Sequence, residues 1–439
     1  MTAIDQALAA HQSGKLDEAE SLYRRILAAD ARNFDALHML GMVHFQHGQI
    51  EQAEQLVRTA LSIRPSIVQC LQNYGNILYC LGRYKDAAES FRCAVIQRPD
   101  FFPALRPLVE LLLAEGSVAE ALDHARRGLA IIETWETKSL VGLCLCSPLV
   151  EPGMSDLRAL LLRALSEPWA DPQDLAATCI RFLGLNETIR KAVPRAAKAW
   201  PNLTECLFTQ QDLAQFAEDR LLPALLECGP LRAVGWERFA TALRFNLLTT
   251  ARTAPNSAVT EPVLNLYCAI ARQCFINDYV FAQSDAEIAA ARALRDKLGA
   301  MLASGHAVPP LLLMAVAAYF PLHTLPAAEA LLNQRWPHAV TALLAQQVRE
   351  PMEERLARSS MPTLTTIDEA VSLQVRGQYE ENPYPKWCRL ATPGSRPEVL
   401  DKLIASKFPK SPFVALGRTG RVDVLVAVAV PDNPLSGAR

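Results

Sequence analysis

Small residues recur along the first third of the chain at a constant interval of 34 positions. One set of alanines and one set of glycines share this interval, and each set has four members. The alanines are Ala19, Ala53, Ala87 and Ala121, and the glycines are Gly14, Gly48, Gly82 and Gly116. Two complete sets in one register argue against a chance alignment, so they predict a unit of fixed length that is repeated four times.

Each set has a physical reason to recur. The alanines are expected where two helices cross closely, because a larger side chain would push the helices apart. The glycines are expected at the end of the first helix of each unit, since a left-handed backbone costs little only for glycine. Pro65 and Pro99 would end the second and third units, because proline cannot continue a helix. The pattern therefore predicts consecutive helix hairpins over residues 1–133.

Further positions in the same register resemble a known family. Large apolar residues, glycines and aromatic residues recur at the places that they occupy in tetratricopeptide repeats, which have a period of 34 residues. These residues are Leu37, Leu71, Leu105, Gly41, Gly75, Tyr23 and Phe91. The ends of the array are less regular, with Val109 in place of a glycine and Gly128 in place of an alanine.

This resemblance implies a superhelical groove that is lined by the first helix of each pair and binds a protein or peptide. The family's groove positions, transferred one by one, are Asp35, His38, Met42, Phe45, Gln69, Gln72, Asn76, Tyr79, Arg106 and Glu110. Amides in such a groove can pair with the backbone of an extended or helical peptide. The alternative is a merely solvated helix face, which would more often carry lysine and glutamate. The basic clamp of some chaperone-binding relatives is absent, because only Arg106 is cationic.

From residue 148 to residue 363 the period stops, but the pattern stays helical. Apolar residues recur at every third or fourth position in segments 157–165 and 216–226, which predicts helix in both. Prolines divide the region into short helices. They are Pro168, Pro201, Pro230, Pro255, Pro309 and Pro321. We expect an all-α middle domain.

No metal site or catalytic group is predicted. His44 and His47 share a helical face, but no further ligands converge on them in the sequence. Cys144 and Cys146 are separated by one residue, not by the two typical of zinc or redox pairs, so buried free thiols are expected. Cys274 lies near an acid without a neighbouring histidine, which favours a dense apolar helix over a cysteine nucleophile.

Charge and composition exclude some classes of partner. The formal net charge is −2, which gives no general attraction to nucleic acid or to an anionic membrane. No apolar run approaches the roughly 20 residues of a membrane span. Eleven cysteines without framework spacing fit a reducing compartment, and a cytoplasmic location is expected.

A second unusual motif lies near the end of the chain, where residues 378–387 read QYEENPYPKW. Its distinctive residues are Tyr379, Glu380, Glu381, Asn382, Pro383, Tyr384, Pro385 and Trp387. By composition alone they could either line a site or join two domains. Together with segments 274–281, 319–322 and 336–337, the motif resembles bacterial proteins that join tetratricopeptide repeats to a class I S-adenosylmethionine-dependent methyltransferase domain. In that group the motif precedes the methyltransferase fold, and full-length relatives bind S-adenosylmethionine.

The chain departs from this family directly after the motif. Residues 422–427 predict the apolar strand that would begin a Rossmann-like α/β domain, but the next residues, VAVPDNP, contain no glycine-rich turn. We therefore expect only a truncated, short C-terminal remnant of that domain and no cofactor in this chain. With suitable codons, a one-base change of frame would encode Gly-Cys-Gly-Thr-Gly here, so a frameshift is one hypothesis for the truncation.

The sequence thus predicts three regions: a repeat array at 1–133, an all-α domain at 148–363, and a linker with the methyltransferase remnant at 364–439. The expected function is a protein-interaction scaffold without catalytic activity. The alternative is an S-adenosylmethionine-dependent methyltransferase. A repeat-containing glycosyltransferase is disfavoured, because no donor-binding domain is visible.

Overall fold

A computed structural model of the chain describes residues 2–151, 157–167, 169–201, 203, 205–255 and 259–360. The chain divides into two compact units, with the boundary between residues 155 and 156. The described residues form helices, with no strand among them. The strand expected at 422–427 and the motif at 378–387 lie outside the described residues.

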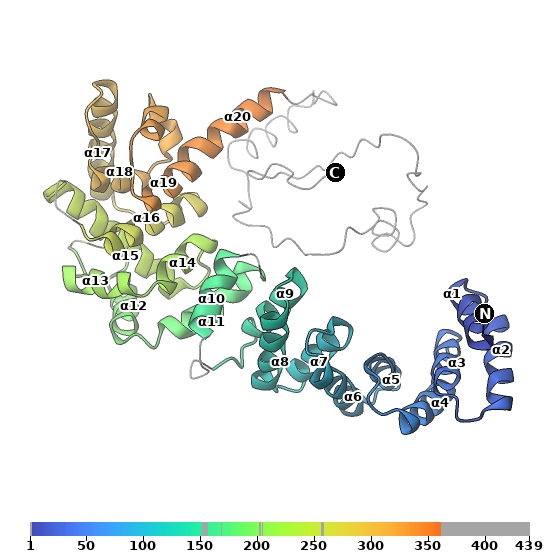
Figure 1. The fold of residues 1–439 in the computed structure, drawn as a ribbon. Coiled ribbons are helices and arrows are strands. Elements are labelled where there is room, and N and C mark those ends of the chain that lie inside the picture. Colours follow the sequence, from blue (N-terminus) through green and yellow to red (C-terminus); the bar gives the residue numbers. More distant parts are fainter. Residues whose placement is uncertain are drawn as a thin grey trace, which may run out of the picture. The chain divides into compact units, whose positions relative to one another are not determined.

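The first unit consists of four helix hairpins in a row, followed by a ninth helix (Figure 1). Each hairpin packs against the next, and α9 packs against α7 and α8. The helices are α1 (Ala3–Gln12), α2 (Leu16–Ala29), α3 (Phe34–Gln46), α4 (Ile50–Ile63), α5 (Val68–Cys80), α6 (Tyr84–Gln97), α7 (Phe102–Ala114), α8 (Val118–Ile131) and α9 (Trp135–Leu145). The predicted array of helix hairpins is confirmed.

The periodic alanines and glycines lie where the sequence analysis placed them, at close helix crossings and in tight turns. All four aligned alanines are completely buried in the second helices of the hairpins. The four aligned glycines lie in the turn inside each hairpin and have positive φ angles, from 73° at Gly82 to 83° at Gly116. Only glycine adopts this left-handed backbone without steric strain. The 34-residue interval therefore arises because every repeat contains one tight turn and one close helix crossing.

A second glycine position brings the two helices of a hairpin into direct contact. A Cβ atom added at Gly75 would lie 2.5 Å from the Phe91 ring, and one added at Gly41 would lie 2.5 Å from Cγ2 of Val57. Phe91 itself is fully buried, as is Tyr23 at the corresponding position of the first repeat. In the third repeat the Phe91 ring of the second helix thus fills the space that Gly75 leaves in the first.

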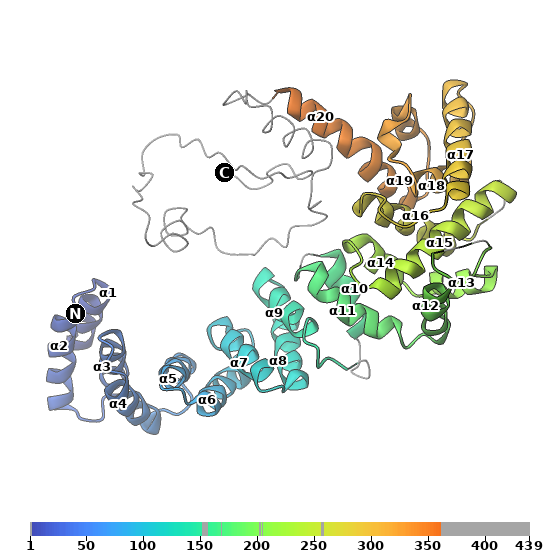
Figure 2. The ribbon, with the colours of Figure 1, turned by 180° about the vertical axis from the view of Figure 1, so that it is seen from behind.

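The second unit is an irregular bundle of helices. The long helices α15 and α16 lie between the group α10–α14 and the group α17–α20 (Figure 2). The helices are α10 (Leu157–Ser166), α11 (Pro172–Leu183), α12 (Glu187–Ala199), α13 (Gln210–Glu218), α14 (Leu221–Cys228), α15 (Val234–Thr253), α16 (Glu261–Ile276), α17 (Asp285–Ala303), α18 (Pro310–Ala317), α19 (His338–Leu344) and α20 (Glu350–Ser360), with the short turns η1 (Leu322–Thr324), η2 (Ala328–Asn333) and η3 (Ala345–Arg349). Among the helices described in the two units, none combines the length and the apolar character that crossing a membrane requires.

One helix expected in this unit is interrupted. Segment 157–165 lies in α10 as predicted, but segment 216–226 breaks at Asp219 and Arg220, between α13 and α14. The Asp219 carboxylate accepts a hydrogen bond from the backbone N–H of Leu221 at 3.2 Å and pairs with Arg158 at 2.8 Å. The backbone at Asp219 is extended, so a new helix begins at Leu221 where the apolar pattern alone predicted continuity. The expected proline breaks in the described residues, at 201, 230, 255, 309 and 321, all fall between helices, and Pro168 lies outside them.

Candidate functional site

The first helices of the hairpins pack against one another in sequence order, α1 on α3, α3 on α5 and α5 on α7. We call the accessible face of these four helices the first-helix surface. Side-chain hydrogen bonds connect neighbours along it. His11 Nε2 lies 3.1 Å from Oε1 of Gln46, which joins α1 to α3, and the Asn73 amide donates to Nε2 of His38 at 2.9 Å, which joins α3 to α5.

The imidazole of His38 is held in its neutral form. The side chain is only 3% exposed, and burial lowers its pKa from 6.5 to about 4, although the nearby Asp35 carboxylate acts in the opposite direction. A neutral ring can accept the hydrogen bond from Asn73 at Nε2, whereas an imidazolium cannot. His38 therefore acts as a fixed polar joint between two repeats.

Further side-chain amides of α5 form hydrogen bonds next to Asn73. Gln69 donates to the side-chain oxygen of Gln72 at 2.8 Å and, more weakly, to that of Asn73 at 3.5 Å. Gln69 is exposed, whereas Gln72 is buried. The chain of polar groups therefore leads from an accessible amide at the surface to the buried imidazole.

The ten predicted groove residues differ in how accessible they are. Asp35, Gln69, Tyr79, Arg106 and Glu110 are exposed. Met42, Phe45 and Asn76 are half-buried, and His38 and Gln72 are buried. The last two contribute to packing between repeats more than to any surface that a ligand could touch.

The exposed positions have distinct chemistry. The Arg106 guanidinium lies 2.8 Å from the Glu110 carboxylate, so the two charges largely neutralise each other. The Tyr79 ring is 50% exposed and meets the Tyr84 ring edge to face, with 5.2 Å between the ring centres. No hydrogen-bond partner is found for the Asn76 amide among the residues that the structure describes. Amides and an aromatic ring, not net charge, therefore dominate the surface of α5.

Sequence analysis missed Asn73, which is the partner that orients His38. The two residues are 35 positions apart, and so are His11 and Gln46. A search for pairs of polar residues separated by 35 positions, the repeat length plus one, would have included both pairs. Nothing in the sequence, however, shows that this offset brings neighbouring first helices into contact.

The histidines at positions 38, 44 and 47 differ in environment. His38 and His44 are buried, and His44 bonds to the Gln49 side chain. His47 lies with Asp17 and Glu20, and among the described residues this is the one group of three potential metal ligands, with ligand atoms within 4.8 Å of one another. The Asp17 side chain is fully exposed, and the imidazole is 3.7 Å from Glu20, so the group also fits a solvated ion pair.

The second unit contains a buried polar cluster around Arg244 of α15. The Arg244 side chain is completely buried and donates to the Glu287 carboxylate at 2.8 Å and to the carbonyl of Ala282 at 2.7 Å. The Tyr319 hydroxyl donates to the same Glu287 carboxylate, and the guanidinium lies 4.4 Å from the centre of the Tyr319 ring. Because a buried charge is costly without partners, these bonds hold α15, α17 and the segment after α18 together, although Nε of Arg244 has no hydrogen-bond partner among the described residues.

A second group of bonds anchors the turn after α16. Asp278 and Tyr279 have positive φ angles of 54° and 59°. The Tyr279 hydroxyl donates to the carbonyl of Ala317 at 3.2 Å, and the buried Gln347 amide donates to the same carbonyl at 3.1 Å. Segment 274–281, which carries part of the methyltransferase resemblance, is thus bound to the end of α18 inside the helical unit.

Cys274 lies inside this region and is fully buried. Burial raises the pKa of its thiol to about 12, although the Arg244 guanidinium acts to lower it. The pKa of Cys144 is also raised to about 12 by burial. The thiolate is the reactive form of cysteine, so neither residue is set up as a nucleophile.

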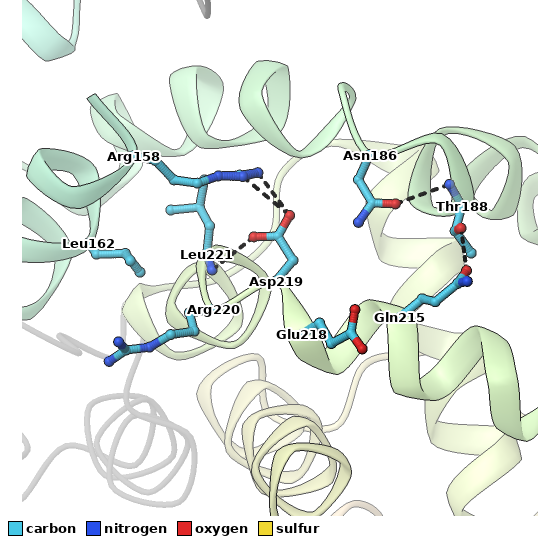
Figure 3. A pocket seen from close by; sticks show the side chains of 9 residues that line it. All are labelled: Arg158, Leu162, Asn186, Thr188, Gln215, Glu218, Asp219, Arg220 and Leu221. Carbon is cyan, nitrogen blue, oxygen red and sulfur yellow. Dashed lines mark hydrogen bonds and ion pairs between the residues drawn. The ribbon is translucent and has the colours of Figure 1, made fainter. Parts of the chain in front are cut away.

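An open pocket of about 530 Å³ lies between α10, α12, α13 and α14 (Figure 3). Its lining residues are Arg158, Leu162, Asn186, Thr188, Gln215, Glu218, Asp219, Arg220 and Leu221. Many of the polar groups are paired within the lining.

Asp219 is bound by Arg158, and the Thr188 hydroxyl donates to Gln215 at 2.5 Å. Burial raises the pKa of Asp219, and Arg158 acts in the opposite direction. Glu218 and Arg220 lie on opposite sides of Asp219, so no group of reactive side chains converges here.

Comparisons with known families match only the first unit. Residues 12–93 match the family model described as anaphase-promoting complex, cyclosome, subunit 3, and residues 75–133 match a tetratricopeptide repeat model. Neither match reaches residues 378–387, on which the methyltransferase resemblance mainly rests. No curated protein is matched by the sequence.

Several solved structures are similar in part. A crystal structure of MamA is 17% identical, covering 33% of this chain and 83% of that one, with a TM-score of 0.30. PilF of Pseudomonas aeruginosa is 17% identical over 58% of this chain and 91% of that one, with a TM-score of 0.30. Naa15/Naa10 bound to HypK-THB is 15% identical over 87% of this chain and 58% of that one, with a TM-score of 0.37. Scores of this size assign neither a common fold nor a function to the whole chain.

The family matches and the four hairpins with their buried alanines and left-handed glycines agree on residues 12–133. The N-terminal unit therefore contains an array of tetratricopeptide repeats.

Proposed function

We propose that the chain is a protein-interaction scaffold and that its first-helix surface binds a polypeptide segment. The observation that carries this proposal is the chain of polar groups from His38 through Asn73 to Gln69. These groups are held in place by bonds to one another. A pre-ordered surface loses less side-chain freedom when a partner binds.

The composition of this surface favours recognition of backbone over recognition of charge. Gln69 and Asn76 can each donate and accept hydrogen bonds, as the peptide groups of a partner require. Met42 and Phe45 of α3 are half-buried, and Tyr79 of α5 is half-exposed, so all three offer apolar contact area beside the amides. A partner segment with small or apolar side chains and accessible backbone groups fits this surface.

A selection experiment tests the proposal. Peptides are selected from a displayed random library on the full chain, and their affinities are measured for the wild type and for the triple variant Gln69→Ala, Asn76→Ala, Tyr79→Ala. We expect the variant to bind at least about tenfold more weakly, because removing a central aromatic contact alone commonly costs more than 1 kcal/mol.

The matched control places the same kinds of change on second helices. Gln52→Ala, Gln55→Ala and Ile96→Ala remove two exposed amides and one exposed apolar side chain from α4 and α6. We expect wild-type affinity for the selected peptides. Equal losses in both triple variants would contradict a site on the first helices.

The methyltransferase alternative rests on the motif at residues 378–387, outside the described residues. Because residues 428–434 lack a glycine-rich turn, we propose that this chain does not hold S-adenosylmethionine. Isothermal titration of the full chain with S-adenosylmethionine is expected to give no binding heat. Micromolar binding would favour the enzyme instead.

A further inference from the structure

The outer face of α12 carries an exposed row of cations. Arg190, Lys191, Arg195 and Lys198 recur at intervals of one, four and three residues, which places them on one side of the helix. The opposite side, with Ile189, Ala192 and Ala196, is buried in the second unit. We call the four residues the α12 cation row.

Positive charge exceeds negative charge along this row. Lys191 pairs with Glu187 at 2.6 Å, and Arg195 reaches Asp212 only at 4.0 Å. Arg190 and Lys198 have no ion-pair partner among the residues that the structure describes. Arg190 shares the field of the Glu187 carboxylate with Lys191, so one carboxylate stands against three cations at this part of the row and positive charge remains in excess.

Aromatic and cationic groups extend the row beyond the end of α12. Trp200 directly follows the helix and is 37% exposed. The Arg238 guanidinium of α15 lies 4.5 Å from the centre of the Trp200 ring and donates to the carbonyl of Ala197 at 3.5 Å. A partner that follows the cations therefore also meets an accessible indole ring, which is a common anchor in interfaces.

We propose that the α12 cation row binds an acidic segment of a partner protein. From Arg190 to Lys198 the row is about 12 Å long and one helix face wide, at 1.5 Å of rise per residue. This narrow shape fits one chain that carries carboxylates at every third or fourth residue.

A broad anionic surface would fit less well, because it would also meet the carboxylates of Glu187 and Asp212 at the edge of the row. This second site is independent of the first-helix surface.

Fluorescence anisotropy with the full chain tests the proposal. The probe is a short, labelled, alanine-based helical peptide with glutamate at every fourth position, and a glutamine version of it is the control ligand. We expect the glutamate peptide to bind at low salt, binding to weaken as salt is added, and the glutamine peptide not to bind.

The informative variant is Arg190→Glu with Lys198→Glu, because neither substitution breaks an ion pair among the described residues. We expect its affinity for the glutamate peptide to fall at least about tenfold. The matched control is Arg292→Glu with Lys297→Glu, which reverses two exposed cations on α17 and is expected to bind like the wild type. A thermal melt of each variant, compared with that of the wild type, reports whether the second unit is still folded.

Two results would overturn the proposal. Equal affinities of the two folded double variants would show that the α12 cation row is not the site. Tighter binding of phosphatidylglycerol vesicles or single-stranded DNA than of the glutamate peptide, lost in the α12 variant, would assign the row to a membrane or a nucleic acid.

Discussion

The side-chain amide of Asn73 lies 2.9 Å from Nε2 of His38, and this bond joins the first helices of two successive repeats. The bond requires a neutral imidazole at Nε2, and burial keeps it neutral by lowering the pKa of His38 to about 4. The bond therefore holds two repeats together, and the burial of His38 makes their stability depend on pH.

We predict that the first unit loses stability as the pH falls from 6.5 to 4. The unfolded chain takes up a proton at His38 near pH 6.5, whereas the folded chain does so only near pH 4, so protonation favours unfolding between these values. The contribution is fully present above pH 6.5 and amounts to about 3 kcal/mol, at about 1.4 kcal/mol per pKa unit. Denaturant unfolding at a series of pH values measures it.

The control for this prediction is His38→Gln. Glutamine offers an acceptor to Asn73 but does not titrate, so the loss between pH 6.5 and 4 should be smaller in the variant by about the same amount. His124, whose pKa is also lowered by burial, titrates in both proteins and cancels in the comparison. Parallel pH profiles for the two proteins would show that His38 is not the responsible group.

Gly75→Ala is predicted to destabilise the first unit by about 1 to 3 kcal/mol through overpacking. The added methyl group would lie 2.5 Å from the Phe91 ring, which is buried and cannot move away freely. Gly299→Ala in α17 is the control, because no atom lies within 4 Å of its added Cβ. That change should be neutral or stabilising, since alanine favours helix over glycine. Equal midpoints of denaturation for Gly75→Ala and the wild type would contradict the close crossing.

Gly82→Ala is predicted to destabilise by about 1 kcal/mol for a different reason. Nothing lies within 4 Å of the added Cβ, so the cost arises from the φ angle of 73° alone. Gly82→Asn should cost less, because asparagine tolerates the left-handed region better than alanine does. Urea denaturation of the two variants checks the order, and a more stable Gly82→Ala protein would argue against the left-handed turn.

Glu287→Gln is predicted to destabilise the second unit by about 3 to 5 kcal/mol. The substitution leaves the completely buried Arg244 without its carboxylate partner, and a buried unpaired charge is costly. Replacing both residues, as in Arg244→Met with Glu287→Met, should cost less than the single change. Glu205→Gln, at an exposed loop position, serves as the neutral control. Calorimetry that found the single variant as stable as Glu205→Gln would rule out a structural ion pair.

Cys274 is predicted to resist alkylation in the folded protein. With a pKa of about 12, only about one thiol in ten thousand is ionised at pH 8, and the side chain is fully buried. The exposed Cys80 should react with iodoacetamide much faster. Mass spectrometry of peptides after brief labelling measures both residues. If Cys274 and Cys80 reacted with iodoacetamide at comparable rates in the folded chain, a nucleophilic role for Cys274 would be supported.

The repeat architecture was predictable because two positions per unit accept only very small residues. A tight turn requires glycine at position 82, and a close helix crossing requires alanine at position 87, so both leave a fixed interval in the sequence. The burial of His38 and Gln72 was not predictable. The burial of these two side chains depends on the rotation of each first helix relative to the next one. The residue types in the sequence do not indicate this rotation.

The second unit shows a similar limit. The pattern of residues 216–226 favoured one continuous helix, but the helix ends at Asp219, whose carboxylate pairs with Arg158, 61 residues away in the sequence. Segments 274–281 and 319–322 stood out in the sequence, yet nothing there indicated that they meet around Arg244 of α15. The position of the helix break and the packing of the two segments both involve contacts between residues far apart in the sequence. The local periodicity of apolar residues carries no information about such contacts.

The central claim is that the first helices of the repeats form the surface that binds a polypeptide. Hydrogen–deuterium exchange of the full chain, with and without a library-selected peptide, tests it most directly. Slower exchange of backbone amides in α3 and α5 on peptide binding, with α4 and α6 unchanged, is the predicted result. Protection confined to α4 and α6, or to the second unit, would contradict the claim.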